Sequence, residues 1–265
     1  MSAARRRRAS AALELAAFAL LVGVVCARPP TRVVVLGDSI TAGISSQPYG
    51  PGYADLLRDR LGPEYEVVSL GCAGTTTRDW QPDAPPSTCR GPGEPIHLYA
   101  SARALLPADV VTILLGTNDL RVPDAVEPDA YRDALRTLAE TLHADGAHDV
   151  VLISPPIAIH VAARLAGYRV RLRELCVERS YLQCGPDLVE VLDPAVDFEP
   201  GDVHPNRSGH EKIAAALADD LRALTAGVRR IEVAPRRAAR TPRAGRRRSR
   251  SRPRPRAPRG RRSHT

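Results

Sequence analysis

The stretch RVVVLGDSI, residues 32–40, decides the fold because an unbroken apolar run ends there at a glycine followed by polar residues. Residues 32–36 are predicted to be the first strand, and the apolar run within it indicates burial on both faces, which is typical of a parallel sheet covered by helices. Gly37 permits a tight turn after this strand. Ser39 therefore stands at a strand exit, the place where ligands bind in open parallel sheets.

Further apolar runs follow the first, and segments of helical periodicity alternate with them. We expect the remaining strands at residues 65–70, 110–115, 150–154 and 188–192. Apolar residues at helical spacing predict three helical faces, which are Tyr53, Leu56, Leu57 and Leu61, then Tyr131, Leu135, Leu138 and Leu142, and last Ile213, Leu217, Leu221 and Leu224. The segments 76–97 and 155–184 are expected to be loops that form pocket walls. The alternation predicts an α/β fold, a three-layer α/β/α sandwich with a parallel five-stranded sheet and right-handed crossovers.

The charge of the chain is unevenly distributed. The chain has 265 residues, of which 43% are apolar and 26% are charged, so it can bury a full core. Its formal net charge is +8. Residues 229–265 are strongly basic, with sixteen arginines and one acid, whereas residues 33–228 are acidic, with 28 acidic and 16 basic side chains. The basic isoelectric point thus describes the tail, and nucleic-acid binding does not follow from it.

Both ends are expected to lie outside the globular domain, which we place at residues 28–227. Residues 1–27 contain four consecutive arginines, an apolar run at Leu15–Val25 and a small residue at Ala27. This order predicts a cleaved signal peptide, with an uncleaved membrane anchor as the alternative. Residues 228–265 are rich in Arg, Pro and Ser and are predicted to be a disordered basic tail.

These ends predict a secreted or cell-envelope-associated protein. The basic tail favours at most a nonspecific attraction to anionic envelope polymers. It contains no aromatic side chain that could stack on bases, so we expect no specific nucleic-acid partner. We also expect no obligate protein partner.

Export would leave four cysteines in the mature chain, Cys72, Cys89, Cys176 and Cys184. An even number in an oxidising compartment favours two disulfides. Of the three possible pairings, Cys72 with Cys89 and Cys176 with Cys184 close the shortest loops. Four buried free thiols are the alternative. Because neither a Cys-x-x-Cys motif nor a histidine cluster accompanies these residues, we expect no metal and no other cofactor.

Candidate chemical groups recur where the other expected strands end. Gly74 follows the second strand and Asn118 follows the third, and each can donate a hydrogen bond to an anion. His204 precedes the last helix and has a carboxylate, Asp202, two residues before it. Taken singly, each is an ordinary turn or loop residue. The carboxyl ends of parallel strands lie at one edge of the sheet, so these residues and Ser39 are expected to lie close together. Together they predict the groups needed for acyl transfer, with Ser39 as nucleophile, Gly74 and Asn118 as oxyanion donors and His204 as base.

Four sequence blocks carry a family resemblance over about residues 32–226, and they are Gly37-Asp38-Ser39, Gly74, Gly116-Thr117-Asn118-Asp119 and His204-Pro205-Asn206. In this order they resemble the blocks of the SGNH hydrolases, also called GDSL esterases and lipases. The resemblance implies that Ser39 is the nucleophile and His204 the general base. It implies an oxyanion hole made by the backbone N–H groups of Ser39 and Gly74 and by the Asn118 side chain. Asp38, Asp119 and His210 are interpreted as structural.

One departure from the family pattern concerns the group that orients His204. The family's usual block is Asp-x-x-His, but the residue three before His204 is Gly201. Either the Asp202 carboxylate or the Gly201 carbonyl could orient the imidazole, and we favour Asp202.

The predicted function is that of a secreted serine esterase that hydrolyses acyl esters through an acyl-enzyme on Ser39. An aromatic content of only 4% favours short or medium acyl chains over long triglycerides. Carbohydrate O-deacetylase and thioesterase activity at the same site remain alternatives. A different class of alternative is a non-catalytic envelope-binding module that acts through the Arg-rich tail.

Overall fold

The computed structural model describes residues 29–44, 50–89, 93–121, 125–156 and 162–233. The chain divides into two compact units, Met1–Ala226 and Gly227–Thr265. The sheet and the candidate site belong to the first unit. Of the second unit, only the end of the last helix is described. The predicted signal peptide and residues 234–265 of the predicted tail lie outside the described residues.

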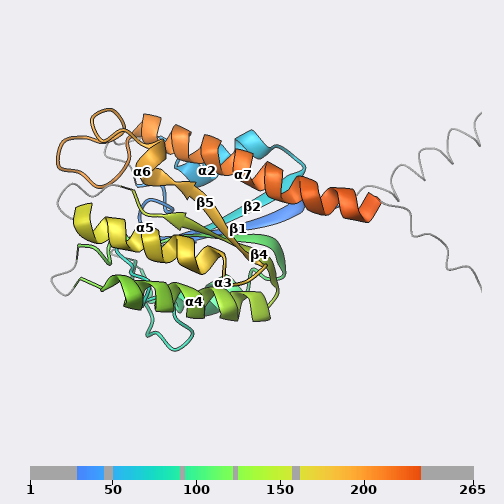
Figure 1. Ribbon diagram of the computed structural model, residues 1–265, viewed down its shortest axis with the longest axis horizontal. Helices are drawn as coiled ribbons and strands as arrows, with labels where there is room; N and C mark the ends of the chain where they lie inside the picture. The colour runs from blue at the N-terminus through green and yellow to red at the C-terminus, as the bar shows by residue number, and fades with distance from the viewer. Residues whose placement is uncertain (1–28, 45–49, 90–92, 122–124, 157–161, 234–265) are drawn as a thin grey trace, which may run out of the picture. The chain divides into compact units, whose positions relative to one another are not determined.

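Five parallel strands form one sheet in the order β2-β1-β3-β4-β5 (Figure 1). Their bounds are β1 Thr31–Gly37, β2 Tyr65–Gly71, β3 Ala108–Leu114, β4 Ala147–Ser154 and β5 Leu182–Asp187. The first four strands coincide with predicted apolar runs. Gly37 at the end of β1 is in register with Gly71 of β2 and with Leu114 of β3, so the carboxyl ends of these three strands lie side by side.

Helices cover both faces of this sheet, which confirms the predicted α/β sandwich (Figure 1). The helices are α2 Tyr53–Leu61, α3 Leu98–Arg103, α4 Pro128–Ala144, α5 Ala162–Cys176, α6 Leu188–Val191 and α7 Arg207–Val233. Val34 and Leu36 of β1 join the core under α3, α4 and α5, whereas Val33 and Val35 join the core under α2, α6 and α7. Burial of successive side chains on opposite faces explains why the strand is apolar throughout.

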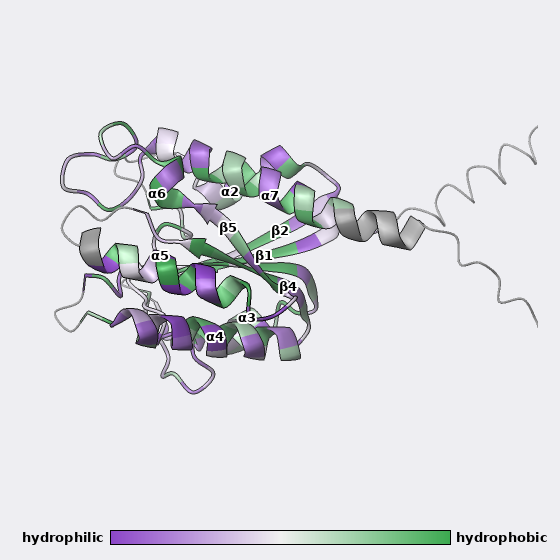
Figure 2. Ribbon diagram, viewed as in Figure 1, coloured by the Kyte–Doolittle hydropathy of each residue, from purple (hydrophilic) through white to green (hydrophobic). Residues whose placement is uncertain are grey.

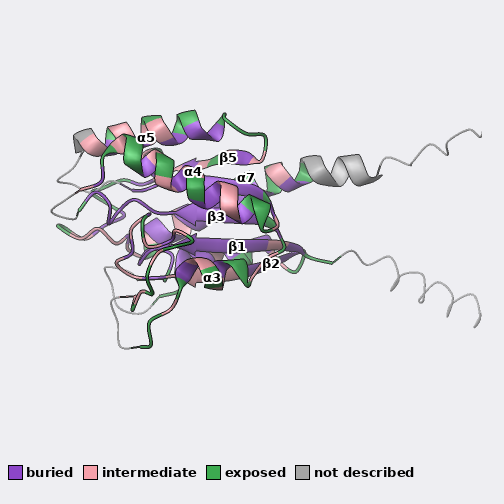
Figure 3. Ribbon diagram, turned by 90° about the horizontal axis from the view of Figure 1, so that it is seen from below, coloured by how far each residue is buried: buried purple, intermediate pink, exposed green. Residues whose placement is uncertain are grey.

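Amphipathic helices hold the apolar sheet between them (Figure 2). The side chains of α4 that the sequence predicts to face the core are all buried, namely Tyr131, Leu135, Leu138 and Leu142. The helix starts with Pro128 at its first position, where the missing N–H costs no helical hydrogen bond. Figure 3 shows the strands as the most buried layer and the outer helical surfaces as exposed.

The predicted fifth strand at 188–192 is wrong. Residues 188–191 form the short helix α6, whose first turn is capped because the Asp187 carboxylate accepts a hydrogen bond from the Val189 N–H. The fifth strand is the preceding segment β5, which lies at the sheet edge and pairs only with β4. An edge strand need not be continuously apolar, and a short apolar run alone does not separate a strand from a helix.

The segment 155–184 is also not the loop that we predicted, because α5 and the start of β5 lie within it. The buried side chains of α5 recur at helical spacing, and they are Leu165, Tyr168, Leu172 and Leu175. That periodicity is readable in the sequence and predicts the helix. The final helix α7 continues to Val233, beyond the predicted domain boundary at residue 227.

Two disulfides tie segments of the first unit together. Cys72 is joined to Cys89, and Cys176 at the end of α5 is joined to Cys184 in β5. These are the two shortest-loop pairs. Within the described ranges, no cluster of three or more His, Cys, Asp or Glu side chains could hold a metal ion. None of the described helices combines the length and the apolar character needed to cross a membrane.

Candidate active site

The turn after β1 presents Ser39 at the carboxyl edge of the sheet, where the connecting loops gather on the left of Figure 1. The turn closes through hydrogen bonds from the Ala42 N–H to the Asp38 carbonyl and from the Ile44 N–H to the Ser39 carbonyl, each 2.9 Å long. A side-chain carbon at Gly37 would collide with Thr41 and with the Leu114 carbonyl. Glycine at this position therefore lets the chain fold back tightly.

His204 and Asp202 reach this turn from the loop that precedes α7. His204 Nε2 lies 3.0 Å from Ser39 Oγ, and His204 Nδ1 lies 2.9 Å from Asp202 Oδ1. Residues that are 165 positions apart in the chain are thus within hydrogen-bonding distance. The geometry selects Asp202, not the Gly201 carbonyl, as the partner of the imidazole.

The surroundings of Asp202 keep its carboxyl group ionised. Partial burial by itself raises its pKa, but hydrogen bonds from the His204 backbone N–H, the His204 ring and the Val203 N–H outweigh this effect and hold the pKa below its ordinary value. An ionised carboxylate only accepts hydrogen bonds. The Nδ1 atom of His204 is therefore the donor, and in the neutral imidazole this tautomer leaves Nε2 free to accept the Ser39 hydroxyl proton.

The candidate oxyanion donors come from the three adjacent strand exits. Within the described residues, the backbone N–H groups of Ser39 and Gly74 donate no hydrogen bond to other parts of the protein. Gly74 has φ of +82°, a backbone conformation that favours glycine. The Asn118 amide nitrogen donates to the Thr75 carbonyl at 2.9 Å and stands 3.5 Å from Asp38 Oδ2. Because the longer contact is weak, a substrate oxygen could replace Asp38 as the acceptor of the second amide hydrogen.

A network of buried threonines, not predicted from the sequence, supports these donors. The Thr75 hydroxyl donates to the Cys72 carbonyl and accepts from Trp80 Nε1, which is fully buried. The Asp119 carboxylate accepts from both the hydroxyl and the N–H of Thr77. The loop after β2 is thereby fastened to the loop after β3. No short-range sequence signal identifies the contact between Thr77 and Asp119, because these residues are 42 positions apart.

Asp38, next to the nucleophile, is a fully buried acid. Burial raises its pKa most and the nearby Asp119 adds to this, whereas the Ile40 N–H, which donates to Asp38 Oδ1 at 3.0 Å, lowers it; the net result is a pKa of about 7. The side chain faces the inside of the turn and the Asn118 amide. It has no contact with His204, which fits the structural interpretation drawn from the sequence.

His210 belongs to the packing of α2 and α7. Its Nδ1 accepts the N–H of Tyr53, the first residue of α2, at 3.1 Å, and its ring stacks against the Tyr53 ring. Nε2 lies 3.2 Å from the Ile44 carbonyl. Burial lowers the pKa of His210, which therefore stays neutral at pH 7.

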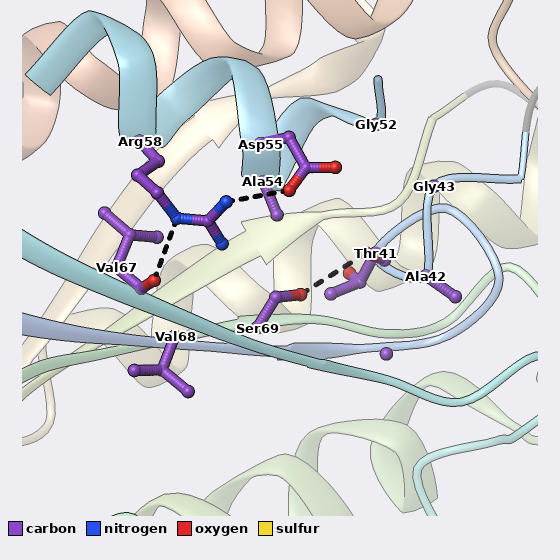
Figure 4. Close-up of a pocket in the computed structure, with 11 residues that line it drawn as sticks. Thr41, Ala42, Gly43, Gly52, Ala54, Asp55, Arg58, Val67, Val68 and Ser69 are labelled. Carbon is purple, nitrogen blue, oxygen red and sulfur yellow. Dashed lines mark hydrogen bonds and ion pairs between the residues drawn. The ribbon is translucent and has the colours of Figure 1, made fainter. Parts of the chain in front are cut away.

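A hollow of about 520 Å³ lies on the outer side of the same turn (Figure 4). It is lined by Thr41–Gly43, by α2 and by the edge strand β2, and Arg58 crosses it to reach Asp55 and the Val67 carbonyl. Neither Ser39 nor His204 contributes to its wall. The hollow is thus separate from the candidate catalytic groups.

Comparisons with known proteins agree with the fold and with the sequence blocks. The model of the GDSL-like Lipase/Acylhydrolase family matches residues 35–212. The solved native aryl esterase of M. smegmatis is similar with a TM-score of 0.59 and 20% identity, covering 73% of this chain and 99% of that one.

Two further solved structures show the same likeness. A carbohydrate acetylesterase from Sinorhizobium meliloti has a TM-score of 0.53 and 21% identity, with 73% of this chain and 99% of that chain covered. A lipase/acylhydrolase from Enterococcus faecalis has a TM-score of 0.54 and 19% identity, with 73% and 96% covered. The curated proteins include no match to this chain. At these identities the structural likeness establishes the fold alone.

Proposed function

Because the chain belongs to the GDSL-like lipase/acylhydrolase family and is thus an ester-hydrolysing serine hydrolase, we propose that Ser39, His204 and Asp202 are its catalytic triad. The observation that carries this proposal is the continuous line of contacts from Asp202 through His204 to Ser39, at 2.9 Å and 3.0 Å. These distances are within the range of good hydrogen bonds. The same arrangement of base, orienting acid and hydroxyl activates serine nucleophiles on unrelated folds.

In the first half of the reaction, the Ser39 hydroxyl transfers its proton to His204 Nε2 as Oγ attacks the ester carbonyl carbon. The carbonyl oxygen becomes an oxyanion, which the N–H groups of Ser39 and Gly74 and the Asn118 amide stabilise. Asp202 stabilises the imidazolium and keeps its proton-bearing Nδ1 in place. The C–O bond to the alcohol then breaks, and His204 returns the proton to the leaving alcohol.

In the second half, water hydrolyses the acyl-enzyme by the same steps. His204 Nε2 accepts a proton from the water, whose oxygen attacks the acyl carbonyl carbon. The bond between the acyl carbon and Ser39 Oγ breaks, and the proton passes to Oγ. A carboxylic acid leaves and the enzyme is restored. None of these steps requires a metal, so we expect activity to survive treatment with a chelator.

For the substrate, we propose esters of short or medium acyl chains. The large apolar side chains exposed among the described residues are Ile44, Val170, Val177 and Val196. Val170 and Val177 lie in and directly after α5 and the other two lie in separate loops, so four side chains of modest size are all that is exposed to a long acyl chain. An acetylated carbohydrate is the second candidate, favoured by the likeness to the Sinorhizobium meliloti acetylesterase. Thioesters fit the same chemistry.

We propose that the protein acts outside the cytoplasm. Its two disulfides fit an oxidising compartment. The predicted signal peptide agrees with this proposal. Recovery of the protein from the culture medium or envelope fraction without residues 1–27, shown by N-terminal sequencing, is the expected result, and a cytoplasmic full-length chain would contradict it.

Replacement of the nucleophile tests the proposed chemistry. Ser39→Ala should lower kcat for p-nitrophenyl acetate by about 10⁴-fold or more, because the acyl-enzyme cannot form. Ser69→Ala is a matched control, since its hydroxyl lies beside the same turn, 3.5 Å from the Thr41 carbonyl, and should keep the parental kcat. Turnover by Ser39→Ala equal to that of the parent would refute the assignment.

A panel of substrates tests the specificity. We expect kcat/KM to be highest for acetyl and butyryl esters or for an acetylated sugar. A kcat/KM that rises steadily up to sixteen-carbon acyl chains would overturn the proposed preference, and a preference for thioesters would redefine the leaving group.

A further inference from the structure

The loop between α6 and α7 carries both His204 and Asp202, and one buried carboxylate fastens its two ends. Asp197 has no exposed surface. Its Oδ2 accepts hydrogen bonds from Lys212 Nζ at 2.6 Å and from the Asp193 N–H at 2.7 Å, and its Oδ1 accepts from the Ser208 hydroxyl at 2.8 Å. The carboxylate therefore binds the start of the loop and the first turns of α7 at once.

Backbone contacts close the loop above this carboxylate. The Asn206 N–H donates to the Asp197 carbonyl at 2.8 Å, and an antiparallel bridge pairs Phe198 with Pro205. A side-chain carbon at Gly209, in the first turn of α7, would crowd both Pro205 and the Asp197 carbonyl. Residues 193–206 thus form a closed hairpin. Its tip, residues 199–204, presents Asp202 and His204 to Ser39.

Lys212 forms an ion pair with the buried carboxylate of Asp197. Lys212 is the only lysine of the chain, and its side chain is 41% exposed, whereas its partner Asp197 is 0% exposed. Burial by itself raises the pKa of Asp197, but Lys212, the Asp193 N–H and Ser208 outweigh this effect and hold the pKa below its ordinary value. A buried carboxylate that loses its cation is left with an uncompensated charge, so the groups around it must reorganise.

We propose that Asp197 and Lys212 are positioning residues, whose ion pair holds the 193–206 hairpin in the place where His204 reaches Ser39. This inference rests on the proposed function, in which His204 is the base. Asp197 and Lys212 do not contact the reacting atoms and act only through the hairpin. A displacement of the catalytic groups by about 1 Å can lower the rate a hundredfold, so a loosened hairpin lowers kcat while the protein remains folded.

Substitution of the full-length protein at Lys212 tests the inference by kinetics. Lys212→Met should lower kcat for p-nitrophenyl acetate by about tenfold to a hundredfold and leave KM nearly unchanged. Lys212→Arg, which restores a cation, should recover most of the loss. Arg207→Met is the matched control, because it breaks an exposed pair with Glu211 at 3.0 Å on the same helix and should leave kcat unchanged. Folded Lys212→Met with parental kcat would overturn the proposal.

Ser208→Ala provides a milder variant if Lys212→Met does not fold. It removes one hydrogen bond to Asp197 and leaves the ion pair in place. A loss of kcat of about twofold to tenfold is expected, and parental kcat would count against the positioning role.

A spectroscopic measurement separates this inference from the proposed function. The Nδ1–H of His204 donates to a carboxylate, so its proton should give a resonance far downfield in the parent protein and in Arg207→Met. We expect the resonance to disappear or broaden in folded Lys212→Met. Its persistence unchanged would overturn the positioning role, whatever the activity is. Full activity of Ser39→Ala would instead overturn the proposed function and leave this measurement valid.

Discussion

At the scale of single residues, the contact between Asp202 and His204 compensates for the shifted position of the acid. Asp202 lies two residues before the histidine, and the tight turn brings three groups onto its Oδ1, namely the Val203 N–H, the His204 N–H and the His204 ring. In the proposed triad, the carboxylate thus shapes the turn and orients the imidazole with the same oxygen.

This double role makes Asp202→Asn a sensitive test. The amide keeps an acceptor oxygen for the backbone N–H groups but cannot stabilise the imidazolium. We expect kcat to fall by roughly 10³- to 10⁴-fold with little loss of stability. Thermal unfolding monitored beside the kinetics is the control. A loss of less than tenfold would show that another group, such as the Gly201 carbonyl, orients His204.

The buried carboxyl of Asp38 predicts a pH dependence of stability. Its pKa is raised from 3.8 to about 7 in the folded protein, so the folded state binds this proton more tightly than the unfolded state does. The contribution of protonated Asp38 to the unfolding free energy is therefore complete below pH 4 and is lost as the pH rises through 7. Between pH 5 and pH 8 the parent protein should lose up to roughly 3 kcal/mol of unfolding free energy through Asp38. Asp38→Asn should not show this part of the loss. Urea unfolding at both pH values measures it, and equal decreases in parent and variant would contradict the assignment.

At the scale of elements, the sequence predicts what depends on local periodicity and misses what depends on neighbours. The buried strand β1 and the helix α4 follow directly from their apolar patterns. The edge strand β5 contains Gly185 and Pro186 and is defined by its pairing with β4, so no apolar run marks it. The short apolar segment at 188–191 becomes a helix because Asp187 caps it.

The candidate site divides in the same way. Ser39, Gly74, Asn118 and His204 are predictable because each follows a strand or precedes a helix within a recognisable block. The sequence favours Asp202 over the Gly201 carbonyl, but the choice depends on the local turn geometry. The supporting contacts Thr77–Asp119 and Asp197–Lys212 were missed, because they join segments whose proximity only the folded chain defines.

The two disulfides allow stability to be separated from activity. Cys72–Cys89 closes the loop that carries Gly74, whereas Cys176–Cys184 joins α5 to β5. Replacement of either pair by serine should lower the unfolding free energy by about 2 to 4 kcal/mol. Only loss of the first pair should also lower kcat, because it frees the loop that carries Gly74, the proposed oxyanion donor. Similar kcat values for both double variants would contradict a role of this loop in catalysis.

At the scale of the whole molecule, the acidic body and the basic tail predict separable activities. Residues 234–265 contain fourteen arginines and no acid. A chain that ends at Val233 should keep the parental kcat/KM for a small ester. It should lose retention on an anionic polymer at low salt, because the attraction is electrostatic and screened by ions. Equal retention of both chains would eliminate the tail as an anchor, and loss of ester hydrolysis would show that it takes part in catalysis.

The central claim is that the hydroxyl of Ser39 is the nucleophile and that His204 activates it. The most direct measurement is the reaction of the folded protein with a fluorophosphonate, followed by peptide mapping of the adduct by mass spectrometry. We predict one adduct, on Ser39, and a labelling rate in His204→Gln that is lower by about 10³-fold or more. An adduct on a different residue, or unchanged labelling of Ser39 in the His204 variant, would contradict the account.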